Sequence, residues 1–165
     1  MAALAMKAPL LPEGDAASRH EFVVAFAGDD RHVADYLMEE VLQRQPTHVQ
    51  TFLLQTSILE RLCGPLCDAV TGRDDGQDTL AALEQSDLFI VPLDDRREWY
   101  RYHRLFSDLL QQRLRKTFPD DVAALHRRAS AWYVANGDIP SAIDHALDAE
   151  DFANAADLVA QVAEA

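Results

Sequence analysis

The stretch WYRYHRLFSDLLQQRL, residues 99–114, decides the fold predicted for this chain. Trp99 to Tyr102 is rich in aromatic residues, which favour β-strands. The residues after His103 predict an amphipathic helix, because apolar side chains recur at helical spacing: Phe106, Leu109, Leu110 and Leu114. His103 therefore lies at the junction of a strand and a helix.

The residues before this stretch complete the pattern of a winged helix-turn-helix. Helices are expected from Thr47, after Pro65, and over Gly76 to Ser86, each bounded by Pro or Gly. Leu88 to Leu93 is a second β-rich segment, and Asp94 to Arg97 has the composition of a turn, so the two strands predict a hairpin. Three helices, a β-hairpin and a fourth helix give a fold that is mainly α.

The segments on either side are also predicted to be helical. Before residue 47, Met1 to Lys7 has the pattern of a helix end, and short helices are expected from Ser18 and from Asp29-Asp30. After Pro119, small and large apolar residues alternate in three short helices, as in a stacked helical repeat. A repeat that stopped at Ala165 would expose an apolar face, so we expect either a partner that covers this face or a longer natural chain.

The charge balance limits the classes of partner. The chain has 15 Lys and Arg residues against 28 Asp and Glu residues, a net charge of −13. DNA binding depends on basic side chains that neutralise phosphates, so this balance argues against DNA or an anionic membrane as the main partner. The helix expected at residues 76–86, which would enter the DNA major groove in a DNA-binding winged helix, contains no Lys or Arg.

Membrane and secretion signals are not evident in the sequence. No apolar run approaches the roughly 18 residues that a membrane span requires. The only Lys of the apolar start MAALAMKAPLL follows the apolar residues, which is the wrong order for a signal peptide. The sequence therefore predicts a cytoplasmic protein that does not contact membranes.

Patterns typical of enzymes and metal sites are also missing. The sequence contains neither a G-x-x-x-x-G-K-S/T phosphate loop nor a G-x-S-x-G elbow. Cys63 and Cys67 lack a second pair of cysteines, so they are expected to be buried free thiols. The remaining histidines are scattered without a metal-binding spacing: His20, His32, His48, His126 and His145. We therefore expect neither catalysis nor a metal centre in this chain.

Four pairs of aspartates fall at expected turns or helix starts. Carboxylates at these places can accept hydrogen bonds from free backbone N–H groups and interact favourably with the helix dipole. A capping role is therefore expected for each pair: Asp29-Asp30, Asp74-Asp75, Asp94-Asp95 and Asp120-Asp121.

Four segments together resemble the middle of the MalT-like, LuxR-type transcriptional activators, which are signal-transducing ATPases with numerous domains. The segments are FAGDDRHVADYLMEEVLQRQP (26–46), FLLQTSILERLCGPLCDAVTG (52–72), WYRYHRLFSDLLQQRL (99–114) and LHRRASAWYVANGDIPSAIDHALDAEDFANAADLV (125–159). The family's domain order is an ATP-binding domain, a helical lid, a winged helix, a tetratricopeptide-like sensor and a DNA-binding helix-turn-helix.

The resemblance implies three parts in this chain. Residues 1–46 would hold the end of the nucleotide-binding domain and the helical lid, and residues 47–118 the winged helix. Residues 119–165 would be the first helices of the tetratricopeptide-like sensor. ADP or ATP is implied for the full-length protein, whereas no cofactor is expected in this chain because its phosphate loop is missing.

The resemblance also implies a role for His103. Related ATPases have a histidine at the start of the last winged-helix helix, in a Met-His-Asp or Leu-His-Asp signature, and it contacts the β-phosphate of ADP in the resting state. Tyr102-His103-Arg104 falls at this position, with Arg104 in place of the aspartate. A histidine near a helix N-terminus can donate a hydrogen bond to a phosphate oxygen. The alternative is that His103 only ends the strand and caps the helix.

The function expected from the resemblance is a relay of nucleotide and inducer state between domains. The expected partners are the protein's own nucleotide-binding domain, the remaining sensor repeats and a second copy of the protein. Basic residues of the wing and the next helix are expected to make interdomain contacts: Arg96, Arg97, Arg101 and Arg104. The alternatives are a stand-alone helical adaptor and a DNA-binding winged-helix regulator.

Overall fold

A computed structural model of the chain describes residue 36, residues 39–87 and residues 89–164. The helices expected at Met1 to Lys7 and from Ser18, and the start of the one expected from Asp29-Asp30, lie outside the described residues. Residues 39–43 are helical, in agreement with the later part of the helix expected to end before Pro46.

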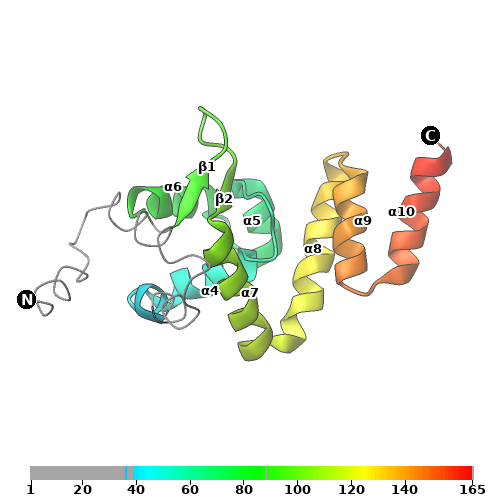
Figure 1. Cartoon of the computed structure of the whole chain (residues 1–165). Helices are drawn as coiled ribbons and strands as arrows, with labels where there is room; N and C mark the ends of the chain where they lie inside the picture. The colour runs from blue at the N-terminus through cyan, green and yellow to red at the C-terminus, as the bar shows by residue number, and fades with distance from the viewer. Residues whose placement is uncertain (1–35, 37–38, 88, 165) are drawn as a thin grey trace, which may run out of the picture.

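A winged helix forms the larger part of the described chain, and the loop between β1 and β2 projects from this domain (Figure 1). The mainly α fold with three helices, a hairpin and a fourth helix is confirmed. The elements in chain order are α4 Thr47–Thr56, α5 Gly64–Thr71, α6 Gly76–Gln85, β1 Ile90–Pro92, β2 Tyr100–Tyr102 and α7 Arg104–Thr117.

The hairpin is antiparallel, and a third segment of the chain, which the sequence did not indicate, pairs with it. Ile90 lies opposite Tyr102, and Pro92 lies opposite Tyr100. Leu62, between α4 and α5, forms a bridge to Tyr100: its N–H donates to the Tyr100 oxygen at 2.7 Å, and the Tyr100 N–H donates to its oxygen at 2.8 Å. The segment between the first two helices is thereby attached to the wing.

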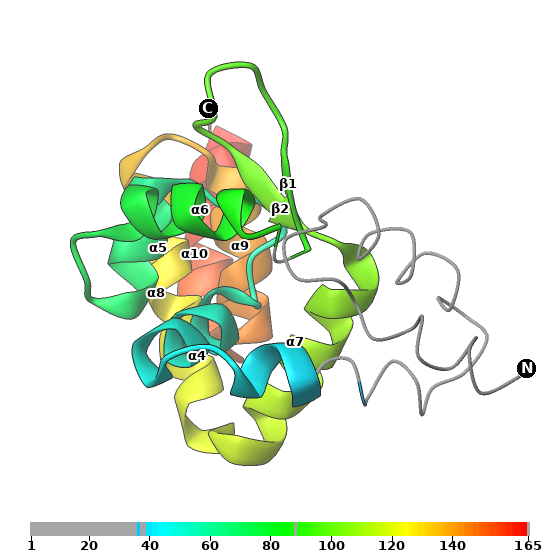
Figure 2. The same ribbon diagram turned by 90° about the vertical axis from the view of Figure 1, so that its left-hand side faces the viewer.

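Three further helices stand side by side beyond α7, as two perpendicular views show (Figures 1 and 2). Their bounds are α8 Val122–Ala135, α9 Ile139–Asp148 and α10 Phe152–Glu164, and the 3-10 turn η1 Pro119–Asp121 precedes them. Gly137 adopts a φ of +83° in the turn between α8 and α9. Asp138 then caps α9, because its carboxylate accepts a hydrogen bond from the Ser141 N–H. These antiparallel helices have the arrangement of a helical repeat.

α7 packs against α4, and its inner face contributes to the core of the winged helix. Three residues at helical spacing on α7 are buried: Phe106, Leu110 and Leu114. The hydroxyl of Thr56 donates to the Phe52 oxygen at 2.8 Å and lies 2.7 Å from the hydroxyl of Tyr102. Because the Thr56 proton is used in the first bond, Tyr102 is the donor in the second. Cys63 and Cys67 are free and buried, as expected, and burial raises the pKa of both thiols.

The acidic pairs differ in role, and the capping expectation is only partly correct. Asp94 does satisfy its turn, since its carboxylate accepts from the Glu98 N–H at 3.0 Å. The side chain of Asp75, which precedes α6, makes no capping hydrogen bond, because its two carboxylate oxygens bind the Arg73 guanidinium at 2.8 and 2.7 Å. A charge-assisted, bidentate pair is stronger than a bond to a neutral N–H. Asp121 precedes α8 without capping it, since η1 leads into the helix there.

None of the helices in the described part of the chain combines the length and the apolar character that a membrane crossing requires.

Candidate functional site

His103 is the N-cap residue of α7 and is half-buried. Its backbone N–H donates to the Phe89 oxygen at 2.7 Å, and its oxygen accepts from the Ser107 N–H at 2.8 Å. The strand therefore ends and the helix begins at this residue, as expected from the sequence. The His103 side chain makes no capping hydrogen bond to the helix. Its contact with a nucleotide stays a prediction.

The four arginines expected at domain interfaces are all exposed, but they are not equivalent. Arg96 lies at the tip of the wing, Arg101 on the outer face of β2, and Arg104 in the first turn of α7. Arg97 instead turns toward α6, where its Nε lies 2.8 Å from Oε2 of Glu84. The structure thus leaves Arg96, Arg101 and Arg104 exposed to solvent and pairs Arg97 within the winged helix.

The wing is attached to α6 by further hydrogen bonds. The Glu84 carboxylate also accepts from the Tyr100 hydroxyl at 3.1 Å, and the amide of Gln77 donates to the Arg97 oxygen at 2.8 Å. Arg97 has a φ of +59°, which is uncommon for a residue with a side chain. Gln77 and Glu84 of α6 therefore hold the wing against this helix.

An interface joins the winged helix to the helical repeat. The rings of Trp99, just before β2, and Trp132, on α8, meet edge to face with their centroids 6.4 Å apart. The Arg61 guanidinium lies 4.8 Å from the centre of the Trp99 ring and 3.8 Å from the Asp138 carboxylate. Arg128 of α8 donates to the oxygen of the α5 residue Val70 at 2.9 Å. These contacts come from both parts of the chain and pack α8 against α5.

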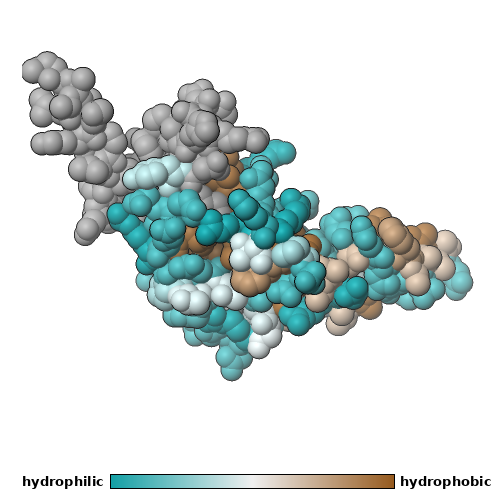
Figure 3. All heavy atoms as spheres, turned by 90° about the horizontal axis from the view of Figure 1, so that it is seen from below, coloured by the Kyte–Doolittle hydropathy of each residue, from teal (hydrophilic) through white to brown (hydrophobic). Residues whose placement is uncertain are grey.

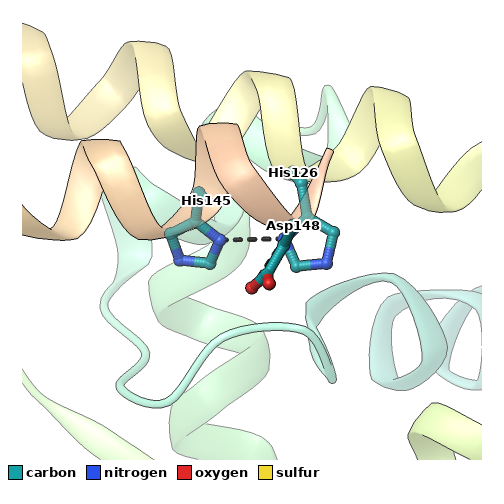
Figure 4. Close-up of side chains that lie close together, drawn as sticks. All are labelled: His126, His145 and Asp148. Carbon is teal, nitrogen blue, oxygen red and sulfur yellow. Dashed lines mark hydrogen bonds and ion pairs between the residues drawn. The ribbon is translucent and has the colours of Figure 1, made fainter. Parts of the chain in front are cut away.

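Two histidines that looked scattered in the sequence are brought together by the fold. His126 of α8 and His145 of α9 point their rings toward each other, beside Asp148 of α9 (Figure 4). Their Nδ1 atoms are 2.9 Å apart, and both rings are buried. The expectation of isolated histidines is therefore wrong for this pair. The turn at Gly137 was the signal in the sequence that could have indicated this pairing. Residues at similar distances before and after a turn between two antiparallel helices can face each other.

Burial controls the protonation of this pair. Desolvation, together with the neighbouring His145, lowers the pKa of His126 to about 4. Desolvation also lowers the pKa of His145, although nearby carboxylates oppose the shift. Both rings are therefore neutral near pH 7, and one donates its Nδ1–H to the other. The ring of Tyr133 stacks on His145 with centroids 5.6 Å apart.

The fold and its contacts define a winged-helix domain continued by a helical repeat. Residues 38–122 match the family model described as the MalT winged helix domain, which is just over half of the chain. The chain belongs to this family, which confirms the resemblance to MalT-like proteins.

Curated relatives of two kinds share this part of their sequence. The serine/threonine-protein kinase PknK of Mycobacterium tuberculosis is 42% identical over 129 residues, covering 78% of this chain and 12% of the kinase. The HTH-type transcriptional regulator MalT of Klebsiella pneumoniae is 39% identical over 76% of this chain and 14% of the regulator. MalT of Serratia proteamaculans is 38% identical over 79% of this chain and 14% of the regulator. The chain thus spans about an eighth of the length of these relatives.

Proposed function

We propose that this chain is the regulatory, protein-interaction segment of a signal-responsive, ATP-dependent transcriptional activator. In this role it relays nucleotide and inducer state between domains. The observation that carries the proposal is the interface between α5, Trp99 and α8, because it joins the two parts that a relay must couple. A switch of this kind requires contacts that differ between its two states.

The nucleotide side of the relay is proposed at the start of α7. A bound ADP would supply phosphate oxygens, and its partners would be His103 and the first-turn N–H groups of a helix N-terminus. Arg101 and Arg104 are exposed on either side of His103 in the sequence and add positive charge. Arg104 stands where related ATPases have an aspartate, so its charge would favour the phosphates. These donors fit a nucleoside diphosphate held by the domain that precedes this segment.

The sensor side is proposed at the last helices. Hydrophobic atoms gather over the C-terminal end of the molecule when it is seen from below (Figure 3). The large apolar residues exposed there come from α9 and α10: Leu147, Phe152, Val159 and Val162. Helical repeats bury such a face against the next repeat. We therefore propose that further sensor repeats cover α10. We also propose that the protein works in the cytoplasm and that it self-associates when activated.

The nucleotide contact is tested in the full-length protein that contains this segment. We expect His103→Ala to speed the release of bound ADP and to raise activation without inducer. His48→Ala, at an exposed position on α4, is the matched control and should change neither. ADP release that is unchanged in His103→Ala would contradict the proposed contact.

The relay itself is tested at the interface. In the full-length protein, Trp132→Ala should leave the binding of inducer and of ADP unchanged but weaken the effect of inducer on ADP release. Val134→Ala, an exposed position on the same helix, serves as the control. If inducer still accelerates ADP release as in the unaltered protein, the interface is not the relay.

A stand-alone helical adaptor is the second candidate, and the exposed apolar residues of α10 favour it. Sequencing the gene upstream of Met1 separates the two functions: an in-frame phosphate loop supports the relay. A gene whose coding region starts at Met1 would instead favour the adaptor, with the α10 face as the binding surface.

Direct DNA binding is the weakest alternative. α6 contains no Lys or Arg, and its Glu84 pairs with Arg97. A gel shift with a random duplex should show no tight complex, and tight, salt-sensitive binding would favour a DNA-binding regulator.

A further inference from the structure

His126, His145 and Asp148 place three metal-ligand atoms close together at the α8–α9 pair. The two Nδ1 atoms are 2.9 Å apart, and Oδ2 of Asp148 lies 4.0 Å from Nδ1 of His126. All three ligand atoms fall within 4.8 Å of one another. The rings are buried, whereas the Asp148 side chain is 63% exposed.

We propose that His126, His145 and Asp148 bind a divalent transition-metal ion of the zinc class between α8 and α9. Two imidazoles and one carboxylate are ligands that Zn²⁺, Ni²⁺ and Cu²⁺ accept. Mg²⁺ and Ca²⁺ prefer sites made of oxygen atoms, so the two imidazoles select against them.

The distances require only small adjustments. Zn–N bonds of about 2.0–2.1 Å in a tetrahedral site place two ligand nitrogens about 3.3 Å apart. The Nδ1 atoms at 2.9 Å must therefore separate by a few tenths of an ångström, which ring rotation supplies. The Asp148 carboxylate must approach His126 by somewhat less than an ångström and His145 by up to about 1.5 Å, which rotation of its exposed side chain supplies. Three protein ligands leave the fourth position to water.

Binding of the ion requires no release of an imidazole hydrogen from His126 or His145. In the metal-free pair, one Nδ1–H donates to the other Nδ1, so one ring carries its hydrogen on Nδ1 and the other on Nε2. When both Nδ1 lone pairs bind the ion, the first ring moves its hydrogen to Nε2. The hydrogen therefore stays on the ring and only changes nitrogen.

The surrounding charges favour a cation on balance. Asp148, Asp144 and Glu60 all act on His145 as negative charges. Arg115 acts on His126 in the opposite sense. Three carboxylates against one guanidinium leave the pocket with a negative environment. An ion here would add a further link between two helices that already share the hydrogen bond from the Ser130 hydroxyl to the Ala142 oxygen.

The test titrates the metal-free full chain with Co²⁺ and Zn²⁺. We expect saturable binding, a Co²⁺ absorption spectrum of nitrogen and oxygen ligands without thiolate charge-transfer bands, and a melting temperature that rises with Zn²⁺. Nitrogen-15 NMR should show that both rings carry their hydrogen on Nε2 after Zn²⁺ is added. Thiolate bands would assign the ion to the cysteines and overturn the proposal.

Variants decide whether these three residues bind the ion. Asp148→Ala changes an exposed side chain, so the fold is retained, and we expect at least a tenfold weaker affinity. His126→Gln and His145→Gln should each abolish saturable binding, with the fold checked by circular dichroism. His48→Ala, at an exposed position, should bind as the unaltered chain does. Absence of saturable binding to the unaltered chain, or an affinity unchanged in Asp148→Ala, would overturn the proposal.

Discussion

The indole rings of Trp99 and Trp132 meet edge to face, with their planes at 74°, where the wing reaches the first repeat helix. Trp99 lies in the hairpin region and Trp132 on α8, 33 positions later in the sequence. The pair therefore links the winged helix directly to the helical repeat. The Arg61 guanidinium lies over the Trp99 ring and extends the contact to Asp138.

We expect Trp99 and Trp132 to be energetically coupled. An edge-to-face aromatic pair contributes about 0.5 to 1.5 kcal/mol beyond the area that it buries. The free energies of unfolding of Trp99→Ala, Trp132→Ala and the double variant should therefore differ from additivity by about this amount. Urea denaturation measures the cycle. Additive effects within about 0.3 kcal/mol would show that the two rings do not stabilise each other.

Tyr102→Phe should lower the free energy of unfolding by about 1 kcal/mol, since it removes one buried hydrogen bond. The Thr56 hydroxyl keeps its bond to the Phe52 oxygen, so no buried donor is left without an acceptor. Tyr36→Phe is the control, because the Tyr36 side chain is 63% exposed and should have no effect. Equal stability of both variants would mean that the Tyr102–Thr56 bond contributes nothing net.

Below about pH 6.5, the free energy of unfolding should decrease as the pH is lowered, partly because of His126 and His145. The folded-state pKa of each ring is lowered, to about 4 for His126, while an unfolded histidine titrates near 6.5. The unfolded chain binds more protons in this window, so stability is complete above about 6.5 and is lost toward pH 4. For His126 alone, the change of pKa from 6.5 to about 4 corresponds to about 3 kcal/mol of stability.

This pH effect is isolated by comparing variants. Urea denaturation between pH 7 and pH 4 should show a weaker pH dependence for the double variant His126→Gln, His145→Gln than for the unaltered chain. His48→Gln should follow the unaltered chain. If the double variant has the same pH dependence, the loss of stability comes from other groups such as carboxylates.

Gly72→Ala should destabilise the chain by about 1 kcal/mol. Gly72 ends α5 with a φ of +78°, a left-handed conformation that residues with a Cβ adopt at a cost. A Cβ at this position would meet no atom within 4 Å, so the effect is conformational and not steric. Gly72→Asn should cost less, because asparagine tolerates this conformation better than alanine. Thermal melting compares the two variants.

Much of the fold was predictable because its signals are local. The apolar spacing of Phe106, Leu110 and Leu114 predicted α7, and their burial agrees with it. Pro65 marked the start of α5, and the structure has this proline in the first turn of the helix. These residues act within one or two helical turns, so the sequence alone contains the information.

The candidate site was predictable only in part. The sequence placed His103 at the strand–helix junction, and the structure has it there. It also treated Arg97 as equivalent to Arg96, whereas the structure pairs Arg97 with Glu84. That pairing depends on how the wing folds back onto α6, which side-chain type and spacing do not reveal.

The sequence by itself determined the order of helices and strands and the junction at His103, because each follows from the periodicity and chemistry of neighbouring residues. The family was indicated separately, by the resemblance of four segments to MalT-like proteins. Only the tertiary structure decided which distant side chains meet. His126 and His145 are 19 positions apart, and Leu62 and Tyr100 are 38 apart, yet each pair is in hydrogen-bond contact. Such contacts depend on how α8 packs on α9 and how the hairpin packs on the helices, and packing depends on the combined shape of many side chains.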